Sequence, residues 1–237
     1  MITSKENEKL KLVRRLADAR HRRREDLFAA EGEDLLAAGL AAGREPELVL
    51  VAGGAGIDGE EVEPRLLDSV STLGSGTRVI SVWRQAWSEP LGPVCVYLDG
   101  IADPGNVGAV IRTADALVDG TVVLGPGCAD PHSPKAVRAS MGSVLSQRLS
   151  RGDVESTPEP RIGMVAHGGE PPRALAPPLT ICLGAEREGL RDEVAAACPR
   201  RWTIPLRMGG AESLNVAAAA AIALGRISSA AREAETS

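Results

Sequence analysis

Residues 94–117, which read VCVYLDGIADPGNVGAVIRTADAL, indicate the fold of the chain. The apolar run at 94–99 reads as a buried strand. Pro104 and Gly105 then turn the chain. After the turn, apolar residues recur at helical spacing as far as Leu117. A strand, a turn and a helix in this order are typical of proteins in which strands and helices alternate.

The same alternation continues through the second half of the chain. Four more short apolar runs are read as strands, at 121–125, 162–166, 179–184 and 201–206. Helices are expected at 106–117, 134–142, 188–197 and 213–228. Short apolar strands that alternate with helices predict a parallel sheet covered on both faces.

Residues 1–84 are expected to form a separate, small α/β domain. Helical patterns and strand-like runs share this part, the helices at 7–24, 32–42 and 60–69 and the strands at 47–52 and 77–82. Residues 85–93, QAWSEPLGP, hold two prolines and a glycine among polar residues, which is typical of a linker. The second domain is therefore expected to cover residues 94–232.

Charge is distributed unevenly along the chain. The net charge is −5, yet residues 1–25 hold nine basic and four acidic side chains, a local charge of +5 that leaves −10 elsewhere. Such a segment is able to neutralise phosphates whatever the overall pI, although a solvated helix face with internal ion pairs gives the same pattern. The five aromatic residues form no cluster in the sequence, so a base-stacking surface is not expected.

Several sequence features are typical of a cytoplasmic protein. The four cysteines stand far apart without a C-x-x-C pair, which disfavours a zinc ribbon and a disulfide framework. No run reaches the roughly 18 apolar residues of a membrane span, and the charged N-terminus lacks the apolar core of a secretory signal. A membrane is therefore not expected as a partner. The three histidines are scattered, so a metal is not expected either.

Residues 54–59, GAGIDG, match the G-x-G-x-x-G pattern of dinucleotide-binding loops. Glu60 and Glu61 follow at once, where their charge opposes a pyrophosphate, and the next expected strand ends without a carboxylate for a ribose. A flexible glycine turn is therefore the preferred interpretation. A nucleotide-binding enzyme of small-molecule metabolism has no other support in the sequence.

Three stretches carry polar residues next to the ends of expected strands. In the first, Asn106 is expected to cap a helix start, and Arg112 lies beside the buried stripe of that helix. In the second, Glu186 follows the strand at 179–184, at the edge where open α/β sheets bind ligands. In the third, Ser-Leu-Asn at 213–215 is expected in a first helical turn, which suits a carboxylate or phosphate. The alternatives are a surface arginine with a capping asparagine and an ordinary acid in a first helical turn.

Taken in order, these stretches resemble the three motifs of the SpoU family of RNA ribose methyltransferases, in the SPOUT superfamily. The first motif, P-G-N-x-G-x-x-x-R, is matched by Asn106 and Arg112. The second, G-x-E-x-x-G-[LM], is matched by Gly184, Glu186, Gly189 and Leu190. The third, I-P-loop-S-L-N, is matched by Ile204, Pro205, Ser213, Leu214 and Asn215.

The resemblance extends beyond the three motifs. Residues 129–143 are similar to a segment usual in the family, and residues 2–40 resemble its accessory substrate-binding domain more loosely. One departure is the 206–212 loop, which is a residue longer than expected. The longer loop affects how the methionine part of the cofactor or the RNA is bound, but the motif residues are all present.

The resemblance implies a fold, a reaction and partners. SPOUT proteins have an α/β parallel sheet whose C-terminal segment makes a deep trefoil knot, here preceded by the small α/β substrate-binding domain. The implied enzyme transfers a methyl group from S-adenosylmethionine to a ribose 2′-hydroxyl of RNA, and the family's dimers imply a homodimer. Ribosomal RNA is favoured over tRNA, because a separate N-terminal domain with a basic helix suits a structured RNA loop.

The resemblance also assigns roles to residues. The implied catalytic residues are Arg112, Asn106, Glu186, Ser213 and Asn215. Arg112 either activates the hydroxyl or, since arginine rarely gives up its proton, holds the adjacent phosphate and stabilises negative charge. The implied cofactor-binding residues are Leu183, Gly184, Ile204 and Leu214. The RNA-binding candidates are Arg14, Arg15, Arg22, Arg23, Arg24 and Arg138.

Three other activities compete with this one. A relative that methylates a base nitrogen is disfavoured by the S-L-N third motif and by the spacing of Asn106 and Arg112. A tRNA 2′-O-methyltransferase remains an alternative. A non-catalytic RNA-binding or ribosome-assembly module would be favoured by loss of Arg112 or of the turn after Gly184, and neither is lost.

Overall fold

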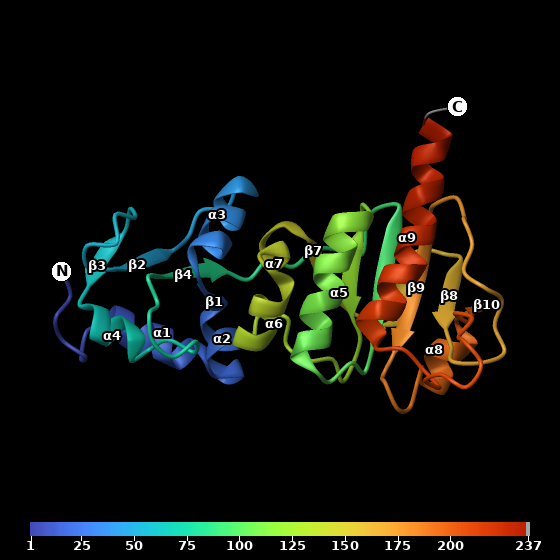
Figure 1. Cartoon of the computed structure of the whole chain (residues 1–237), viewed down its shortest axis with the longest axis horizontal. Helices are drawn as coiled ribbons and strands as arrows, with labels where there is room; N and C mark the ends of the chain where they lie inside the picture. The colour runs from blue at the N-terminus through green and yellow to red at the C-terminus, as the bar shows by residue number, and fades with distance from the viewer. Residues whose placement is uncertain (236–237) are drawn as a thin grey trace. The chain divides into compact units, whose positions relative to one another are not determined.

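The computed structural model describes residues 1–235, with side chains to residue 229, and divides into two compact units (Figure 1). The first unit comprises Met1–Gln85 and Asp130–Ser146, and the second comprises Ala86–Ala129 and the chain from Gln147 onward. The break after Gln85 lies at the start of the expected linker. Residues 130–146 pack with the N-terminal part, however, although the expected division placed them in the second domain.

The first unit is built on a four-stranded sheet in the order β1-β4-β2-β3. Its strands are β1 (Leu27–Glu31), β2 (Leu48–Ala52), β3 (Glu60–Val62) and β4 (Val79–Arg84). Strand β4 pairs antiparallel with β1 and β2, whereas β2 and β3 run parallel. The helices are α1 (Glu8–Leu16), α2 (Ala19–Glu25), α3 (Glu33–Ala41), α4 (Pro64–Asp68), α6 (Pro134–Ser140) and α7 (Ser143–Ser146).

Helix α1 buries one apolar face in the core of the first unit. Leu10, Val13 and Leu16 recur at helical spacing and pack in one cluster with Leu50 of β2 and Ile80 of β4. Burying side chains of this size stabilises the fold by about 1.5–3 kcal/mol each, before the loss of chain entropy. The amphipathic pattern of the sequence therefore fixes how this helix lies on the sheet.

The helix expected at 7–24 is broken in two. The Asp18 side chain accepts hydrogen bonds from the backbone N–H groups of Arg20 (2.8 Å) and His21 (3.3 Å), so it caps a new helix, α2. The segment expected as a helix at 60–69 likewise begins with β3, whose pairing with β2 outweighs its helical pattern.

Helices α6 and α7 explain why residues 130–146 belong to the first unit. Helix α6 packs on β1, and α7 packs on α3. The backbone of Gly142 approaches α3 so closely that a Cβ there would lie 2.5 Å from the Ala38 Cβ. Gly142 also has a φ of +96°, which favours glycine. These contacts are non-local, so the local sequence pattern did not reveal them.

The second unit holds a six-stranded parallel sheet in the order β10-β8-β9-β5-β6-β7, which confirms the expected α/β fold. Its strands are β5 (Val94–Asp99), β6 (Thr121–Leu124), β7 (Arg148–Arg151), β8 (Arg161–Met164), β9 (Leu179–Gly184) and β10 (Arg200–Trp202). Its helical elements are α5 (Pro104–Leu117), the 3-10 turn η1 (Val154–Ser156), α8 (Asp192–Ala196) and α9 (Val216–Glu235).

Helices lie against both faces of this sheet. Figure 1 shows α5 and α9 side by side in front of the strands, and α9 also contacts β9. Val194 of α8 packs in one cluster with Tyr97 of β5 and Cys182 of β9, so α8 covers the opposite side. None of the helices within residues 1–235 is both long and apolar enough to span a bilayer.

Several expected bounds in the second unit are wrong. The strand expected at 201–206 ends at Trp202, and the helix expected at 188–197 shrinks to α8. The final helix begins at Val216 rather than at residue 213. Strands β1 and β7 were not anticipated, because each is short and depends on a neighbouring strand for its hydrogen bonds.

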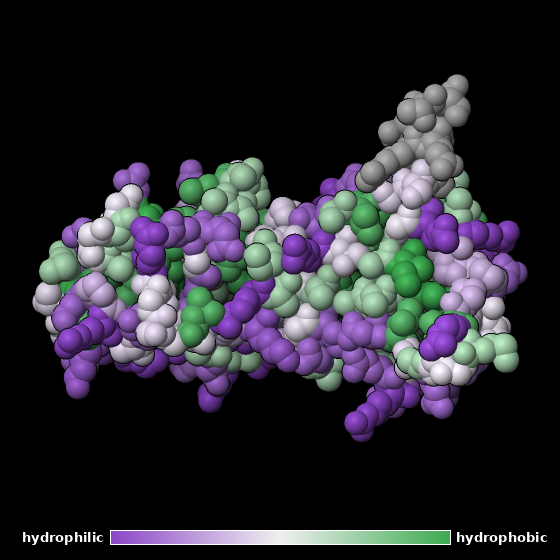
Figure 2. All heavy atoms as spheres, viewed as in Figure 1, coloured by the Kyte–Doolittle hydropathy of each residue, from purple (hydrophilic) through white to green (hydrophobic). Residues whose placement is uncertain are grey.

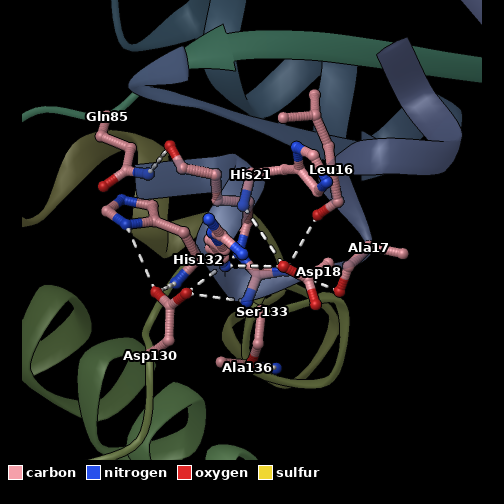
Figure 3. Close-up of polar contacts among 11 residues, drawn as sticks. Leu16, Ala17, Asp18, His21, Gln85, Asp130, His132, Ser133 and Ala136 are labelled. Carbon is pink, nitrogen blue, oxygen red and sulfur yellow. Dashed lines mark hydrogen bonds and ion pairs between the residues drawn. The ribbon is translucent and has the colours of Figure 1, made fainter. Parts of the chain in front are cut away.

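A buried ion pair joins α2 to the start of the 130–146 segment (Figure 3). The Arg22 Nε and Nη2 atoms donate to Oδ2 of Asp130 at 2.9 and 2.7 Å. Its Nη1 atom donates to the backbone carbonyls of Leu16 and Ala17, both at 2.8 Å. The Arg22 side chain is only 3% exposed. The expectation that Arg22 contacts RNA is therefore wrong, because its guanidinium is used inside the first unit.

The ion pair also governs the charge of Asp130. Burial by itself would raise the pKa of this carboxyl, but the hydrogen bonds and positive charge of Arg22 outweigh burial and lower the pKa below its usual value. Asp130 therefore remains ionised when it is folded, and its stabilising effect depends on that charge.

We predict that Arg22→Ala lowers the free energy of unfolding by about 3–5 kcal/mol, because it leaves the Asp130 carboxylate buried without its partner. Urea unfolding at pH 7 measures the loss. Arg23→Ala, at the exposed next position of α2, is the matched control and should change stability by less than about 0.5 kcal/mol. Equal losses in the two variants would contradict the structural role of Arg22.

The same pair predicts a pH dependence. Because the folded pKa of Asp130 is lowered, its stabilisation is complete above the unfolded pKa of about 3.9 and is lost as the pH falls through the folded value. The stability difference between wild type and Arg22→Ala should therefore shrink at pH 3. A difference that stays constant from pH 7 to pH 3 would show that the charge is not involved.

Candidate active site

Three side chains from distant parts of the second unit meet in one hydrogen-bonded group. The Asn106 Nδ2 atom donates to Oε1 of Glu186 at 2.8 Å. The Asn215 Nδ2 atom donates to the same oxygen at 3.0 Å and to Oδ1 of Asn106 at 2.9 Å. This group, here called the amide–carboxylate junction, joins one residue from each of the three stretches that the sequence singled out.

Asn106 contributes to the junction because another residue caps its helix. The Asp103 side chain accepts a hydrogen bond from the backbone N–H of Asn106 at 3.0 Å and so caps α5. The expectation that Asn106 is the cap is therefore wrong. Its amide is left to reach Glu186, which follows the end of β9.

Asn215 has two roles at once. Its Oδ1 atom accepts from the backbone N–H of Ala217 at 2.9 Å, and its carbonyl accepts from Ala219 at 3.0 Å, so Asn215 caps α9. Its Nδ2 atom belongs to the junction. Ser213 and Leu214 therefore precede the helix, although they were expected within its first turn.

The turn after β9 is built by glycine. Ala185 and Gly189 exchange two backbone hydrogen bonds of 3.0 and 2.9 Å, which closes a tight loop around Glu186. A Cβ at Gly184 would lie 2.2 Å from the carbonyl carbon of Gly189, and Gly189 has a φ of +72°. Both positions therefore need glycine, and the second motif follows from this backbone geometry.

A salt bridge fixes the far end of the same turn. Asp99, at the end of β5, is fully buried and accepts from the backbone N–H and from Nε of Arg191, each at 2.7 Å. Hydrogen bonding to Asp99 raises the pKa of the Arg191 guanidinium, which stays charged in any case. Asp99 ends the strand expected at 94–99, but local patterns could not reveal its partner, because 92 residues separate the two.

A cavity of about 520 Å³ opens beside this turn. All four residues predicted to bind a cofactor line it, namely Leu183, Gly184, Ile204 and Leu214. Glu186 and Ser213 line it too. The sequence did not suggest the other walls of the cavity. They come from Met164 at the end of β8, from Val165 and Ala166 just after it, and from Leu206. A mixture of apolar side chains and backbone polar groups is typical of a site for a small organic ligand.

The position of Arg112 agrees with the surface arginine that the sequence left open as an alternative. It lies on the exposed side of α5 and is not held against the core. Within the described part of the chain, its guanidinium makes no hydrogen bond or ion pair. An exposed guanidinium with five donors is suited to bind a phosphate or a developing negative charge.

All of the RNA-binding candidates belong to the first unit, whereas the catalytic candidates belong to the second. Arg14 and Arg23 are exposed, and Arg15 is half-buried. Arg24 pairs with Glu25, its neighbour in sequence. Exposed Arg138 of α6 lies 3.4 Å from the Thr72 hydroxyl, to which it donates. Some of the basic segment is thus neutralised locally, as the ion-paired interpretation of the sequence allowed.

Comparison with known proteins gives this geometry a family context. The family model described as the SpoU rRNA Methylase family matches residues 93–225, which include all three motifs. A structure of an AdoMet-bound rRNA methyltransferase from Sinorhizobium meliloti superposes with a TM-score of 0.84 at 28% identity, covering 98% of this chain and 97% of that one.

Two curated relatives show how far the similarity extends. The 23S rRNA (guanosine(2553)-2′-O)-methyltransferase RlmP of Bacillus subtilis is 28% identical over 251 aligned positions, covering 93% of this chain and 96% of that protein. The ribosomal RNA small subunit methyltransferase G 2 of Syntrophobacter fumaroxidans is 36% identical over 175, covering 69% of this chain. The matched part is only 34% of that protein's length.

We predict that Gly184→Ala destabilises the second unit by about 1–3 kcal/mol, because the added Cβ collides with backbone that the Ala185–Gly189 hydrogen bonds hold in place. Thermal unfolding followed by circular dichroism measures the change. Gly225→Ala is the matched control, since a Cβ at this position in α9 meets nothing within 4 Å. It should leave stability unchanged or raise it, and a Gly184→Ala protein as stable as this control would contradict the proposed role of the turn.

Proposed function

Because this chain belongs to the SpoU rRNA Methylase family, we propose that it transfers a methyl group from S-adenosylmethionine to a ribose 2′-hydroxyl of ribosomal RNA. The observation that supports this proposal best is the convergence of the three motifs. The cavity beside the turn is lined by the residues predicted for the cofactor, and the amide–carboxylate junction ties the same turn to the helix that carries Arg112.

The cavity suits the cofactor in size and chemistry. Its volume of about 520 Å³ lies within the roughly 300–1,000 Å³ of typical small-molecule sites. Leu183, Ile204 and Leu214 would flank an adenine ring, and the backbone around Gly184 would hydrogen-bond polar atoms. When bound, S-adenosylmethionine supplies an electrophilic methyl group on its sulfonium sulfur. The residues of this chain then need to orient and activate the attacking hydroxyl.

Arg112 is the residue that we assign to the reacting ribose. Arginine side chains rarely give up their proton, so we propose that Arg112 holds the adjacent phosphate and stabilises the negative charge that develops on the hydroxyl oxygen. As the C–O bond forms, the methyl–sulfur bond breaks, the hydroxyl proton passes to solvent and S-adenosylhomocysteine leaves. Asn106 and Asn215 would hold the starts of α5 and α9 around the ribose. Glu186 would order both amides, and Ser213 would contact the phosphate or Arg112.

The first unit would deliver the RNA. The exposed arginines Arg14, Arg23 and Arg138 are suited to phosphate contacts that hold an RNA without reading its sequence. Ribosomal RNA is the preferred substrate because RlmP of Bacillus subtilis, which aligns with nearly the whole chain, is named for 23S rRNA. A tRNA substrate and a non-catalytic role remain the competing functions.

Assembly and topology complete the proposal. We propose a homodimer, supported by exposed apolar residues on α9 such as Ile222, which is 38% exposed, and by the apolar surface that Figure 2 shows over this helix. We also propose that the segments at 184–190 and 203–215 form the deep trefoil knot of the superfamily. Free thiols at all four cysteines support a cytoplasmic location.

We predict that wild-type protein transfers tritiated methyl groups from S-adenosylmethionine to bacterial rRNA, and that Arg112→Ala slows the transfer at least about 100-fold. Label recovered in 2′-O-methylated nucleosides after nuclease digestion identifies the product. Cofactor affinity, measured by calorimetry, should stay unchanged in Arg112→Ala because Arg112 does not line the cavity.

Arg200→Ala is the control for this experiment, since Arg200 is an exposed arginine of the same unit outside the cavity. It should keep the wild-type rate. Transfer to tRNA alone would replace the proposed substrate with the alternative one. An absence of both transfer and cofactor binding would contradict the enzyme assignment.

A further inference from the structure

Trp87 is the exception among the aromatic residues of this chain. Phe28, Trp83, Tyr97 and Trp202 are at most 1% exposed, and each contributes to a core. Trp87 is 37% exposed, just after the break between the two units. A single exposed aromatic ring is ordinary on a protein surface, so only its surroundings can indicate a role for Trp87.

An arginine is stacked on this indole. The guanidinium carbon of Arg151, the last residue of β7, lies 4.1 Å from the centroid of the Trp87 ring. The residue next to Trp87 is fixed to the same strand, because the backbone N–H of Ser88 donates to the carbonyl of Leu149 at 2.8 Å. The indole is thus held in place by backbone pairing while much of its surface stays exposed.

A hollow of about 300 Å³ lies beside the pair. Its side-chain polar groups include the hydroxyls of Ser88 and Ser156 and the carboxylate of Glu89. Both hydroxyls already donate to backbone carbonyls, of Leu149 at 3.3 Å and of Asp153 at 2.6 Å, so all three groups offer acceptors to a ligand. A planar aromatic wall, a cation and hydrogen-bonding groups at the edge are the features with which proteins bind unpaired bases. The N–H donors on a base edge match these acceptors.

The hollow lies along the same edge of the sheet as the candidate active site. The strand register connects Gly184 to Asp99, Leu98 to Leu124 and Leu124 to Arg151. All four strands are parallel, so their carboxyl ends share one edge, where open α/β sheets bind ligands. Three strand spacings separate Arg151 from the turn at Gly184, a distance of roughly 14 Å. One extended RNA strand could reach both sites.

We propose that Trp87 and Arg151 form a second RNA contact, in which an unpaired base near the methylated nucleotide stacks in this hollow. The proposal rests on the function proposed above, because it takes RNA as the ligand. The site would position the substrate without touching the reacting ribose, so Trp87 and Arg151 are positioning residues.

Tryptophan fluorescence of the whole protein tests the contact. Titration with an eight-nucleotide oligouridine should quench the emission of the wild type, and Trp87→Phe should remove this response because Trp83 and Trp202 are buried. In parallel, the anisotropy of fluorescein-labelled oligouridine measures affinity. Trp87→Ala should weaken binding about 10-fold, as expected for one stacked base, and Arg151→Met should weaken it too. Trp87→Phe keeps a ring and should bind more tightly than Trp87→Ala.

Further readouts separate this proposal from its alternatives. Cofactor affinity and melting temperature report whether the variants are folded. Variants that melt lower but bind the oligouridine as the wild type does would show that the pair only fastens the linker to β7, which overturns the proposal. If oligouridine quenches the wild type but not Trp87→Phe, and no RNA receives a methyl group, this contact is supported and the proposed enzyme activity is refuted. If rRNA is methylated with the same KM by the wild type and by Trp87→Ala, the enzyme activity is supported and this contact is refuted.

Discussion

The hydrogen bonds among Asn106, Glu186 and Asn215 are the constraint on which the candidate site depends. These residues lie at the start of α5, after β9 and before α9, and up to 109 positions separate them in the sequence. A carboxylate that accepts from two amides fixes the orientation of both side chains. Because Asn215 also caps α9 and Asp103 caps α5, the junction sets where both helices begin relative to the turn at Gly184.

The turn itself is determined by backbone geometry and by a buried charge. Gly184 and Gly189 permit a close approach that no other residue allows, and Asp99 holds the far end through Arg191. The parallel sheet places the ends of β5 and β9 side by side, which brings these elements together. A rigid frame of this kind supports a cavity whose walls come from several segments, and such preorganisation favours tight binding.

Local patterns in the sequence predict much of this arrangement. Strands β5 and β9 match their expected bounds to the residue, since continuous apolar runs bounded by turn residues are a strong signal. Asn106, Glu186 and Asn215 of the three motif segments come together, as the resemblance to the family implied. Non-local contacts explain what was missed. The packing of residues 130–146 on the first unit, the burial of Arg22 against Asp130 and the Asp99–Arg191 bridge all join distant positions. The broken first helix follows from the capping of α2 by Asp18.

The central claim is that the three motifs act as one unit through the amide–carboxylate junction, and a double-mutant cycle tests it most directly. The kcat/KM for methyl transfer is measured for Asn106→Ala, for Asn215→Ala and for the double variant. If the two amides act together through Glu186, the double variant should lose little more than either single variant, with a coupling energy of about 0.5–3 kcal/mol. Losses that simply add would contradict this account and show that each asparagine acts alone.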